Sequence, residues 1–494
     1  MGASIWTPSS TVTPALTAQE ISFLFDDPNA VQTTVWQVLN EFVSVFRFMT
    51  QAQIAAVTAG TMTVDVTVPL QNALLFAREM CCKLFFPPGG YKISSTLIVT
   101  AGITLQGASS VTTIFGVHTI SKTPTRIWQA TAGIACLRVL GNASVDTACD
   151  LNIFDIAFTA NQFPAYNDAP VTNKNAIEFY GTRPYSAYRI SIERCMFFSF
   201  DKSISAVGYD SGAGVDWQID NLLIQRNTFW QCNVGLYANT TNADAWLVSC
   251  NVFVMAPSGV AVYLQRCGYY QGQSNYCVPG YDAGGAAATG CKQYRLGEWP
   301  DTVALRQDAG SDGLEYFIWI DSSTGYENVY QPLILDGCVS EAPCLAERQY
   351  KIISKGTRYT GDFTCSGNDI EVHSDHDSWF PTTKKFVMSG LRPRLFVAPG
   401  STQTSGSVSL LNTTATTAFT LPTSSGWYLV YAWLDGGGAT YASEARLNCD
   451  GTTLTRVSGT NGAGLTITVS GRNVQLTQNS GVTNTWKYAY NRVA

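Results

Sequence analysis

The chain has 494 residues, of which 46% are hydrophobic and 13% charged, with a formal net charge of −6. This hydrophobic content excludes intrinsic disorder, and the low charged fraction excludes a coiled coil or long helical array. The acidic balance argues against a nucleic-acid partner, because phosphate binding requires clustered Lys and Arg. Aromatic residues make up 12% of the chain, more than a core alone needs, which favours a surface on which sugars stack.

The first thirty residues are polar and irregular, as in a flexible or docking segment, and no secretion signal or membrane-spanning run is evident. Apolar residues at helical spacing predict one helix over 31–42 and a second from Leu70 to Cys81. Pro69 suits the first turn of this second helix, and Asp65 or Thr67 could cap it. Three short strands should follow, over 84–93, 96–99 and 103–107. Helix, strand, turn and short strands in this order are typical of the entrance to a right-handed parallel β-helix.

An internal repeat follows these elements. Four similar endings, each closing on a phenylalanine, occur at intervals of 39, 32 and 24 residues: Ile156-Ala157-Phe158, Cys195-Met196-Phe197, Asn227-Thr228-Phe229 and Asn251-Val252-Phe253. Three of them precede a second short run, over 203–207, 234–237 and 260–264. Short strands with variable loops at fixed corners predict the coils of a β-solenoid, in which neighbouring coils supply one another's core. An ordinary β-sandwich is the alternative, although its strands do not keep this register.

The repeat is expected to dissolve into a long insertion between Gly268 and Ser311 and to resume at 316–320. A Gly/Ser/Thr-rich boundary spans 393–407, and short alternating strands beyond it predict a small antiparallel β-sandwich. The fourteen cysteines mostly fall at apolar positions, so buried thiols are favoured over bridges. The candidates for an exception are Cys267, Cys277 and Cys291.

Four segments follow a known pattern: residues 42–50 read FVSVFRFMT, 65–74 DVTVPLQNAL, 85–91 FFPPGGY and 103–107 ITLQG. Together they resemble the bacteriophage tailspikes of the pectate-lyase-like superfamily, which have an aspartate where this chain has Arg47. The predicted C-terminal sandwich is similar to domains that hold such proteins as trimers. These features are structural, so the resemblance informs the fold more than the chemistry.

The resemblance implies an all-β homotrimer: a right-handed parallel β-helix with a C-terminal β-sandwich. It divides the chain into a short anchor or trimmed particle-binding region over 1–41, a receptor-binding and catalytic β-helix with a helical cap over 42–395, and a sandwich over 396–494 for trimerisation, which could also bind glycan. The protein is expected in the phage virion, assembled in the host cytoplasm and attached through its N-terminus to a tail or baseplate protein. No metal, cofactor or membrane insertion is expected.

Tailspikes of this kind bind a bacterial surface polysaccharide, capsule or O-chain, and most often hydrolyse it. The function expected here is therefore an endo-acting glycoside hydrolase, a polysaccharide depolymerase. A polysaccharide lyase is one alternative, for which Arg189, Arg194 and Arg226 could neutralise a uronate. A non-enzymatic receptor-binding spike is the other.

Hydrolysis of a glycosidic bond needs two carboxyl groups about 5–9.5 Å apart. Equivalent positions on adjacent coils lie about 4.8 Å apart, so a column of acids reaches this distance without special loops. Aligning Phe229 with Phe253 places Asp220 opposite Asp244, and this pair is the leading catalytic prediction. The other two catalytic candidates are Asp216 and Glu193, and the predicted substrate-binding residues are Tyr209, Trp217, Arg226, Tyr237 and Trp246.

Each of these acids has a structural alternative, because aspartates at β-helix corners often cap turns through backbone hydrogen bonds. Trp246 could likewise be packing rather than a sugar platform. Competing acids on later coils are Glu315, Asp321, Glu327, Asp336 and Glu341, of which Asp336 before Gly337 is more typical of a turn. The cluster His373, Asp375, His376 and Asp377 is too weak a pattern to predict a metal site.

Overall fold

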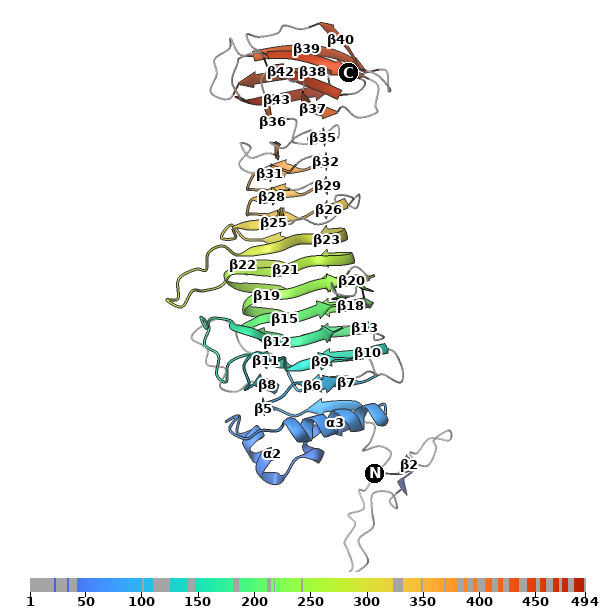
Figure 1. Ribbon diagram of the computed structural model, residues 1–494, viewed down its shortest axis with the longest axis vertical. Helices are drawn as coiled ribbons and strands as arrows, with labels where there is room; N and C mark the ends of the chain where they lie inside the picture. Colours follow the sequence, from blue (N-terminus) through green and yellow to red (C-terminus); the bar gives the residue numbers. More distant parts are fainter. Residues whose placement is uncertain are drawn as a thin grey trace, which may run out of the picture.

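The computed structural model describes residues 22–23, 33–34, 42–99, 102–109, 125–140, 147–180, 186–210, 215–216, 218–240, 243–322, 332–347, 350–367, 370–379, 386–388, 394–397, 405–410, 416–420, 426–434, 442–449, 454–458, 465–470, 473–478 and 484–492. These residues form a tall column of stacked strands with helices near one end and an antiparallel sandwich at the other (Figure 1). The column is a parallel β-helix, as predicted.

Two α-helices cover the entrance of the column. The predicted second helix is confirmed as α3 (Thr67–Glu79), which begins slightly earlier than expected and buries Leu70, Ala73, Leu74 and Ala77. Its first free N–H, that of Thr67, donates to Asp65 Oδ1 at 2.8 Å. The preceding 3₁₀ turn (Val45–Phe48) and α2 (Gln51–Thr58) were not predicted, although Thr50 and Gln53 form a capping box at the start of α2.

The predicted helix over 31–42 falls mostly outside the described residues. At the described positions within it the prediction is wrong: β2 (Thr33–Thr34) pairs antiparallel with β1 (Ser22–Phe23), and Phe42 opens β3 (Phe42–Ser44). An extended Thr-Thr pair is consistent with the preference of β-branched residues for strands.

Each coil of the column contributes to three parallel sheets, which we call A, B and C. Sheet A contains β3, β4 (Lys83–Phe86), β7 (Thr104–Gly107), β10 (Thr147–Phe154), β13 (Ser186–Glu193), β18 (Ile219–Gln225), β20 (Trp246–Ser249), β26 (Pro332–Asp336), β29 (Lys351–Lys355), β32 (Glu371–Asp375) and β35 (Arg394–Val397).

Sheet B contains β5 (Gly89–Ile93), β8 (Thr125–Gln129), β11 (Ala157–Thr159), β14 (Met196–Phe198), β22 (Tyr276–Pro279), β24 (Ala309–Gly310), β27 (Val339–Ser340), β30 (Arg358–Tyr359) and β33 (Ser378–Trp379). Sheet C contains β6 (Leu97–Val99), β9 (Leu137–Val139), β12 (Val171–Tyr180), β15 (Phe200–Val207), β25 (Tyr316–Ile320), β28 (Cys344–Ala346), β31 (Phe363–Cys365) and β34 (Phe386–Met388).

Three long strands bend around corners and belong to more than one sheet. β19 (Thr228–Thr240) runs through sheets B and C, β21 (Val252–Gln273) through B, C and the next turn of A, and β23 (Lys292–Arg306) through C and A. These strands therefore continue the repeat across most of 268–311. The prediction that a long insertion interrupts the repeat there is wrong for most of that range. Within that stretch, β22 and β23 are joined by the loop over 280–291. Glycine and polar residues in these strands hide the apolar alternation on which the prediction relied.

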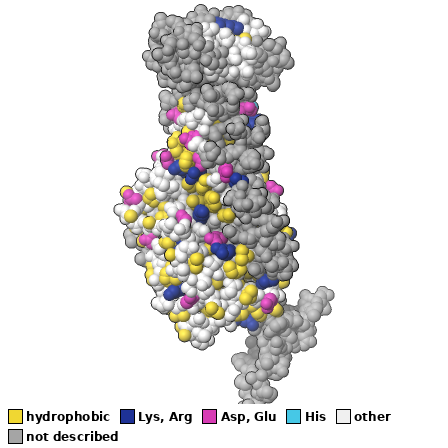
Figure 2. Space-filling model, viewed as in Figure 1, with side chains coloured by type: hydrophobic (Ala, Val, Ile, Leu, Met, Phe, Trp, Pro, Cys, Tyr) yellow, Lys and Arg dark blue, Asp and Glu magenta, His cyan; other side chains and the backbone are white. Residues whose placement is uncertain are grey.

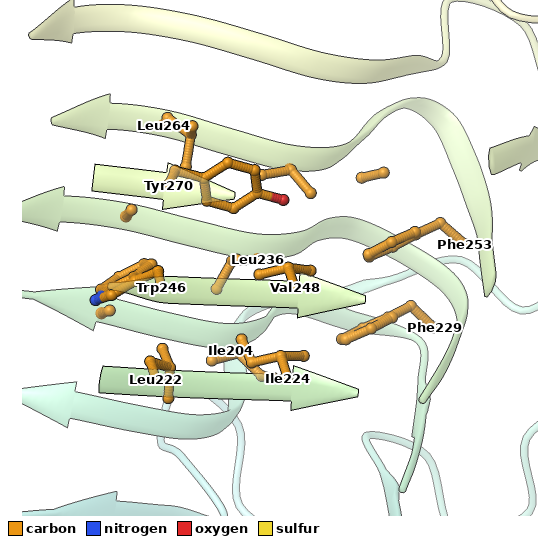
Figure 3. Packing of buried hydrophobic residues seen from close by; sticks show 14 of the residues in the cluster. Ile204, Leu222, Ile224, Phe229, Leu236, Trp246, Val248, Phe253, Leu264 and Tyr270 are labelled. Carbon is orange, nitrogen blue, oxygen red and sulfur yellow. The ribbon is translucent and has the colours of Figure 1, made fainter. Parts of the chain in front are cut away.

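The phenylalanine repeat is confirmed residue by residue. Phe158, Phe197, Phe229 and Phe253 stack in sheet B with ring centroids 5.5, 4.9 and 4.6 Å apart. Figure 3 shows Phe229 and Phe253 one above the other, facing apolar side chains of sheets A and C. The second runs are also in register, since Ile204, Leu236 and Val262 pair successively in sheet C.

The corner between sheets A and B repeats one backbone shape. A residue with φ between +51° and +63° occupies this corner in nine coils: Asp155, Arg194, Arg226, Cys250, Ser274, Gln307, Gly337, Gly356 and His376. The turn predicted at Asp336 and Gly337 is thus confirmed. Just after this corner, the buried side chains of Asn227, Asn251, Asn275 and Asp308 form a hydrogen-bonded ladder that links successive coils.

The C-terminal antiparallel strands are confirmed. One sheet contains β36 (Ser405–Leu410), β38 (Gly426–Leu434), β39 (Ala442–Cys449), β40 (Leu454–Ser458) and β43 (Asn484–Arg492); the other contains β37 (Thr416–Thr420), β41 (Leu465–Ser470) and β42 (Asn473–Gln478). Both sheets contribute to a common core, for example through Leu447 and Ile467. β36 also pairs in parallel with β34, so backbone hydrogen bonding continues from the column into the sandwich.

The described cysteines are free thiols, including Cys267, Cys277 and Cys291. Most are buried, as predicted, but Cys81 and Cys250 are exposed. Cys250 occupies a corner position, with φ of +55°. Among the described residues, no helix has the length and apolar character needed to cross a bilayer.

Candidate functional site

The predicted equivalence of Asp220 and Asp244 follows from the observed strand register. In the pairing of β18 with β20, Leu223 lies opposite Leu247 and Ile224 opposite Val248. Both pairs are 24 residues apart in the chain, as are Asp220 and Asp244. The backbone N–H of Asp244 donates to Asp220 Oδ1 at 2.8 Å, so the two residues are in contact across adjacent coils.

The surroundings of Asp220 resemble those of a corner cap. Its side chain is almost fully buried, and its second oxygen accepts a hydrogen bond from the amide of Gln218. Burial raises the pKa of Asp220, and the like charge of Asp244 adds to this effect, while the hydrogen bonds oppose it. Asp244 itself is exposed. Both oxygens of Asp220 are thus engaged within the protein, which leaves Asp244 as the accessible carboxyl group of the pair.

The structure does not bring Glu193 to this pair. Asp220 lies opposite Tyr188, and Glu193 lies opposite Gln225 at the other end of the same two strands. Five residues of extended chain separate these positions, or about 16 Å along the strand. Glu193 instead accepts a hydrogen bond from Ser191 at 2.6 Å and lies 3.7 Å from Arg194.

Two further predicted residues, Tyr209 and Asp216, are paired in a short β-ladder. Tyr209 in β16 (Tyr209–Asp210) lies opposite Asp216 in β17 (Val215–Asp216), in a short antiparallel pair that precedes β18. Trp217 lies outside the described residues. Asp216 and Tyr209 therefore belong to the same corner as Asp220.

Two of the predicted substrate-binding residues, Trp246 and Arg226, do not lie on one surface with Tyr237. Trp246 is fully buried, next to Tyr270 in sheet A, and its indole N–H donates to the carbonyl of Ile219 (Figure 3). It is a core residue, which contradicts the prediction that it stacks on sugar. Arg226 is exposed at the corner between sheets A and B, so it does not share a face with Tyr237 of sheet C.

The outward face of sheet C carries a column of aromatic and cationic side chains. Register aligns Tyr237 of β19, Tyr263 of β21, Arg295 of β23 and Trp319 of β25 on successive coils. The rings of Tyr237 and Tyr263 are 5.3 Å apart. The Arg295 guanidinium lies between two rings, 4.4 Å from that of Tyr263 and 4.7 Å from that of Trp319. All four side chains are partly exposed.

We call these four residues the sheet C platform. Hydrophobic side chains gather over the central coils in the space-filling view, with Lys, Arg, Asp and Glu side chains among them (Figure 2). Two ion pairs border the platform, Lys292 with Glu315 at 2.6 Å and Arg266 with Glu298 at 3.0 Å. A third joins Arg295 of the platform to Asp321 at 2.8 Å. Partly exposed rings beside charged groups match the amphipathic surface of a sugar.

A second pair of acids occupies equivalent positions beside the platform. Ile320 of β25 pairs with Ala346 of β28, so the next residues, Asp321 and Glu347, follow on adjacent coils. Asp321 Oδ2 accepts from Arg295 Nε at 2.8 Å, and Glu347 Oε2 accepts from Trp319 Nε1 at 2.8 Å. The side chain of Asp321 is 3% exposed, whereas Glu347 is partly exposed.

The remaining competing acids have simpler surroundings. Glu315 pairs with Lys292, Glu341 is exposed, Asp336 precedes the turn at Gly337, and Glu327 lies outside the described residues. No cluster of three or more His, Cys, Asp or Glu residues suited to a metal occurs in the described ranges.

Sequence reasoning singled out Tyr237 and Asp321 but missed Tyr263, Arg295, Trp319 and Glu347 as members of the same site. The predicted insertion removed β23, and Arg295 with it, from the alignment, so the column could not be followed from Tyr263 to Trp319. The available signal was the run Tyr263, Arg295, Trp319, whose intervals of 32 and 24 residues match those of the phenylalanine endings.

No protein-family model matches the chain, and no curated protein matches it. Among solved structures, it is similar to a variant of the tailspike of E. coli bacteriophage HK620 in complex with a pentasaccharide, with 12% identity, a TM-score of 0.48, and coverage of 97% of this chain and 98% of that one. It is also similar to the tailspike of Acinetobacter baumannii bacteriophage Fri1, a capsular polysaccharide depolymerase, with 11% identity, a TM-score of 0.38, and coverage of 93% and 86%.

A third similar structure is PfbA, a surface adhesin of Streptococcus pneumoniae, with 9% identity, a TM-score of 0.39, and coverage of 89% of this chain and 98% of that one. Phage tailspikes, the class that the sequence resembles, are thus among the similar structures. These likenesses concern the fold alone.

Proposed function

We propose that the protein is a phage tailspike that binds a bacterial surface polysaccharide, capsule or O-chain, along the sheet C platform and cleaves it. The observation that supports this most is the alignment of Tyr237, Tyr263, Arg295 and Trp319 on successive coils. Aromatic faces repeated at the strand spacing give an extended polymer a series of contacts in one direction, as a chain of sugars requires.

Cleavage by hydrolysis is assigned to Asp321 and Glu347. Their backbones follow paired positions one strand spacing apart, about 4.8 Å, which is near the separation that retaining glycosidases use. The ion pair with Arg295 suits Asp321 to act as the nucleophile or base. Glu347, whose oxygen accepts from the indole of Trp319, is more accessible and suits the general acid.

The Asp220–Asp244 pair remains the alternative acid pair. Its members meet the same register criterion, but they lie in sheet A, away from the aromatic column of sheet C. A lyase needs a general base, and the platform offers the tyrosines Tyr237 and Tyr263 for that role. A tyrosine acts as a base at neutral pH only if its pKa is lowered, so a lyase is less well supported here. Burial instead raises the pKa of Tyr237 and raises that of Tyr263 to about 12.

The experiment is an assay of purified protein on the surface polysaccharide of a susceptible host. Release of reducing ends supports hydrolysis, an absorbance rise from unsaturated uronate supports a lyase, and binding without either supports a non-enzymatic spike. Replacement of Trp319 by Ala should weaken binding, whereas replacement of Trp128, a partly exposed tryptophan on sheet B, should not. Binding that depends equally on both residues would contradict the placement on sheet C.

Homotrimer formation, attachment to the phage tail and assembly in the host cytoplasm belong to the same proposal. The parallel column and the terminal sandwich are the features that support it. Sedimentation of the purified protein tests the trimer directly.

A further inference from the structure

One partly exposed lysine beside the platform differs from the ion-paired cations around it. Lys202 of β15 places its Nζ 4.2 Å from the ring centroid of Tyr237. Among the described residues, no carboxylate lies within ion-pair distance of it. By contrast, Arg138, Arg266, Lys292 and Arg295 each pair with a carboxylate, at 2.8, 3.0, 2.6 and 2.8 Å.

The acid next to Lys202 in the chain, Asp201, accepts hydrogen bonds from other groups through both of its oxygens. Asp201 accepts a hydrogen bond from Asn233 Nδ2 at 2.9 Å through one oxygen and from the backbone N–H of Asn173 at 3.1 Å through the other. Lys202 and Tyr237 are both partly exposed, so the ammonium group lies beside an open aromatic surface rather than in the core.

We propose that Lys202 and Tyr237 form a subsite for a negatively charged sugar, such as a residue bearing a carboxylate. The ring of Tyr237 packs against the sugar, and the ammonium group of Lys202 pairs with its charge. The chain carries a net charge of −6, so its overall field does not attract anions and the recognition is local. This inference rests on the proposed function, because it assigns a substrate class to the same platform.

The position of Lys202 separates this subsite from the proposed chemistry. Sheet C passes from β15 through β19, β21 and β23 to β25, so four strand spacings, about 19 Å, lie between Lys202 and Trp319. A contact this far from the cleaved bond is the same in the ground state and the transition state. Its loss should therefore raise KM and leave kcat unchanged.

The first test uses defined probes, methyl β-glucuronide and methyl β-glucoside, with binding to the full chain followed by ligand-detected NMR. We expect the wild type to prefer the glucuronide by about three- to tenfold, as befits a partly exposed ion pair beside an aromatic ring. Lys202→Gln should abolish the preference, Lys202→Arg should retain most of it, and added salt should weaken it.

Lys92→Gln is the matched control, because Lys92 also lies over a ring, 5.7 Å from the centroid of Trp128, but on sheet B. It should leave the preference unchanged. Equal affinity of the wild type for the two probes would overturn the subsite, as would a preference that survives Lys202→Gln. A wild type that prefers glucuronide but cleaves no host polysaccharide would remove the proposed activity and leave the subsite standing, so the two failures are distinguishable.

Discussion

Asp308 ends the asparagine ladder by accepting two hydrogen bonds from Asn275, one from its backbone N at 2.6 Å and one from Nδ2 at 3.0 Å. Its other oxygen accepts from the hydroxyl of Tyr294 at 3.0 Å. A carboxyl group thus occupies, in the core, a position that amides occupy in the three preceding coils. Burial raises the pKa of Asp308 to about 7, although these hydrogen bonds oppose the shift.

This geometry predicts that the protein is more stable in mild acid than at neutral pH. The pKa of Asp308 is about 7 in the folded state and about 3.9 in the unfolded chain, so its contribution is fully present below about pH 4 and is lost as the pH rises to 7. Asp377, whose pKa burial raises to about 6, acts in the same direction. Unfolding should be followed between pH 4 and 8 for the wild type and Asp308→Asn. The variant should show a weaker pH dependence and greater stability at pH 8, and an unchanged slope would contradict this account.

The phenylalanine stack should contribute strongly to stability. Phe229 packs between Phe197 and Phe253 and is fully buried, so Phe229→Ala should lower the free energy of unfolding by about 3–5 kcal/mol. Phe163, which is 57% exposed, provides the control, and Phe163→Ala should change stability by less than about 1 kcal/mol. Denaturant titration compares them, and similar losses for both would mean that the stack is not what holds adjacent coils together.

The phenylalanine stack and the buried Asp308 show which parts of the fold can be predicted from the sequence. The phenylalanine stack is visible in the sequence because one large residue recurs at the same point of each coil, and the same alignment correctly placed Asp220 next to Asp244. The role of Asp308 was not predictable in this way, because its ladder partner Asn275 lies in the stretch assigned to an insertion.

The sheet C platform was lost for the same reason. Its central residue, Arg295, lies in β23, and the bulges near Asn239 and Arg266 change the spacing between coils by a residue or more. Burial could not be read from residue type either: Trp246 and Trp319 are both tryptophans in strands, but one faces inward and the other outward. Which one is in the core follows from the three-dimensional register.

The cysteines should divide into two classes by reactivity. In native protein, a thiol reagent should modify Cys81 and Cys250, which are exposed. Buried thiols such as Cys136 and Cys195, whose pKa burial raises to about 12, should react only after denaturation. Mass analysis without reduction should find the described cysteines free to alkylate, and disulfides among them would contradict the structure.

The C-terminal sandwich should contribute strongly to assembly. β36 pairs with β34 of the column and with β43 of the sandwich, so removing everything after Ser401 deletes strands on which the end of the column depends. The truncated protein should be monomeric or aggregated when the full chain is trimeric. A truncated protein that sediments as a trimer of unchanged stability would contradict this prediction.

The central claim is that cleavage occurs beside the sheet C platform, and the most direct measurement is the rate of reducing-end release from native polysaccharide by matched carboxyl variants. Asp321→Asn and Glu347→Gln should each lower kcat by about 10²- to 10⁴-fold while leaving polysaccharide binding intact. Glu178→Gln, which alters the Arg138–Glu178 ion pair on the same sheet, should retain the wild-type rate, as should Asp220→Asn and Asp244→Asn. Full activity of the Asp321 and Glu347 variants, with loss of activity in the Asp220 and Asp244 variants, would contradict the account and place the chemistry at the other pair.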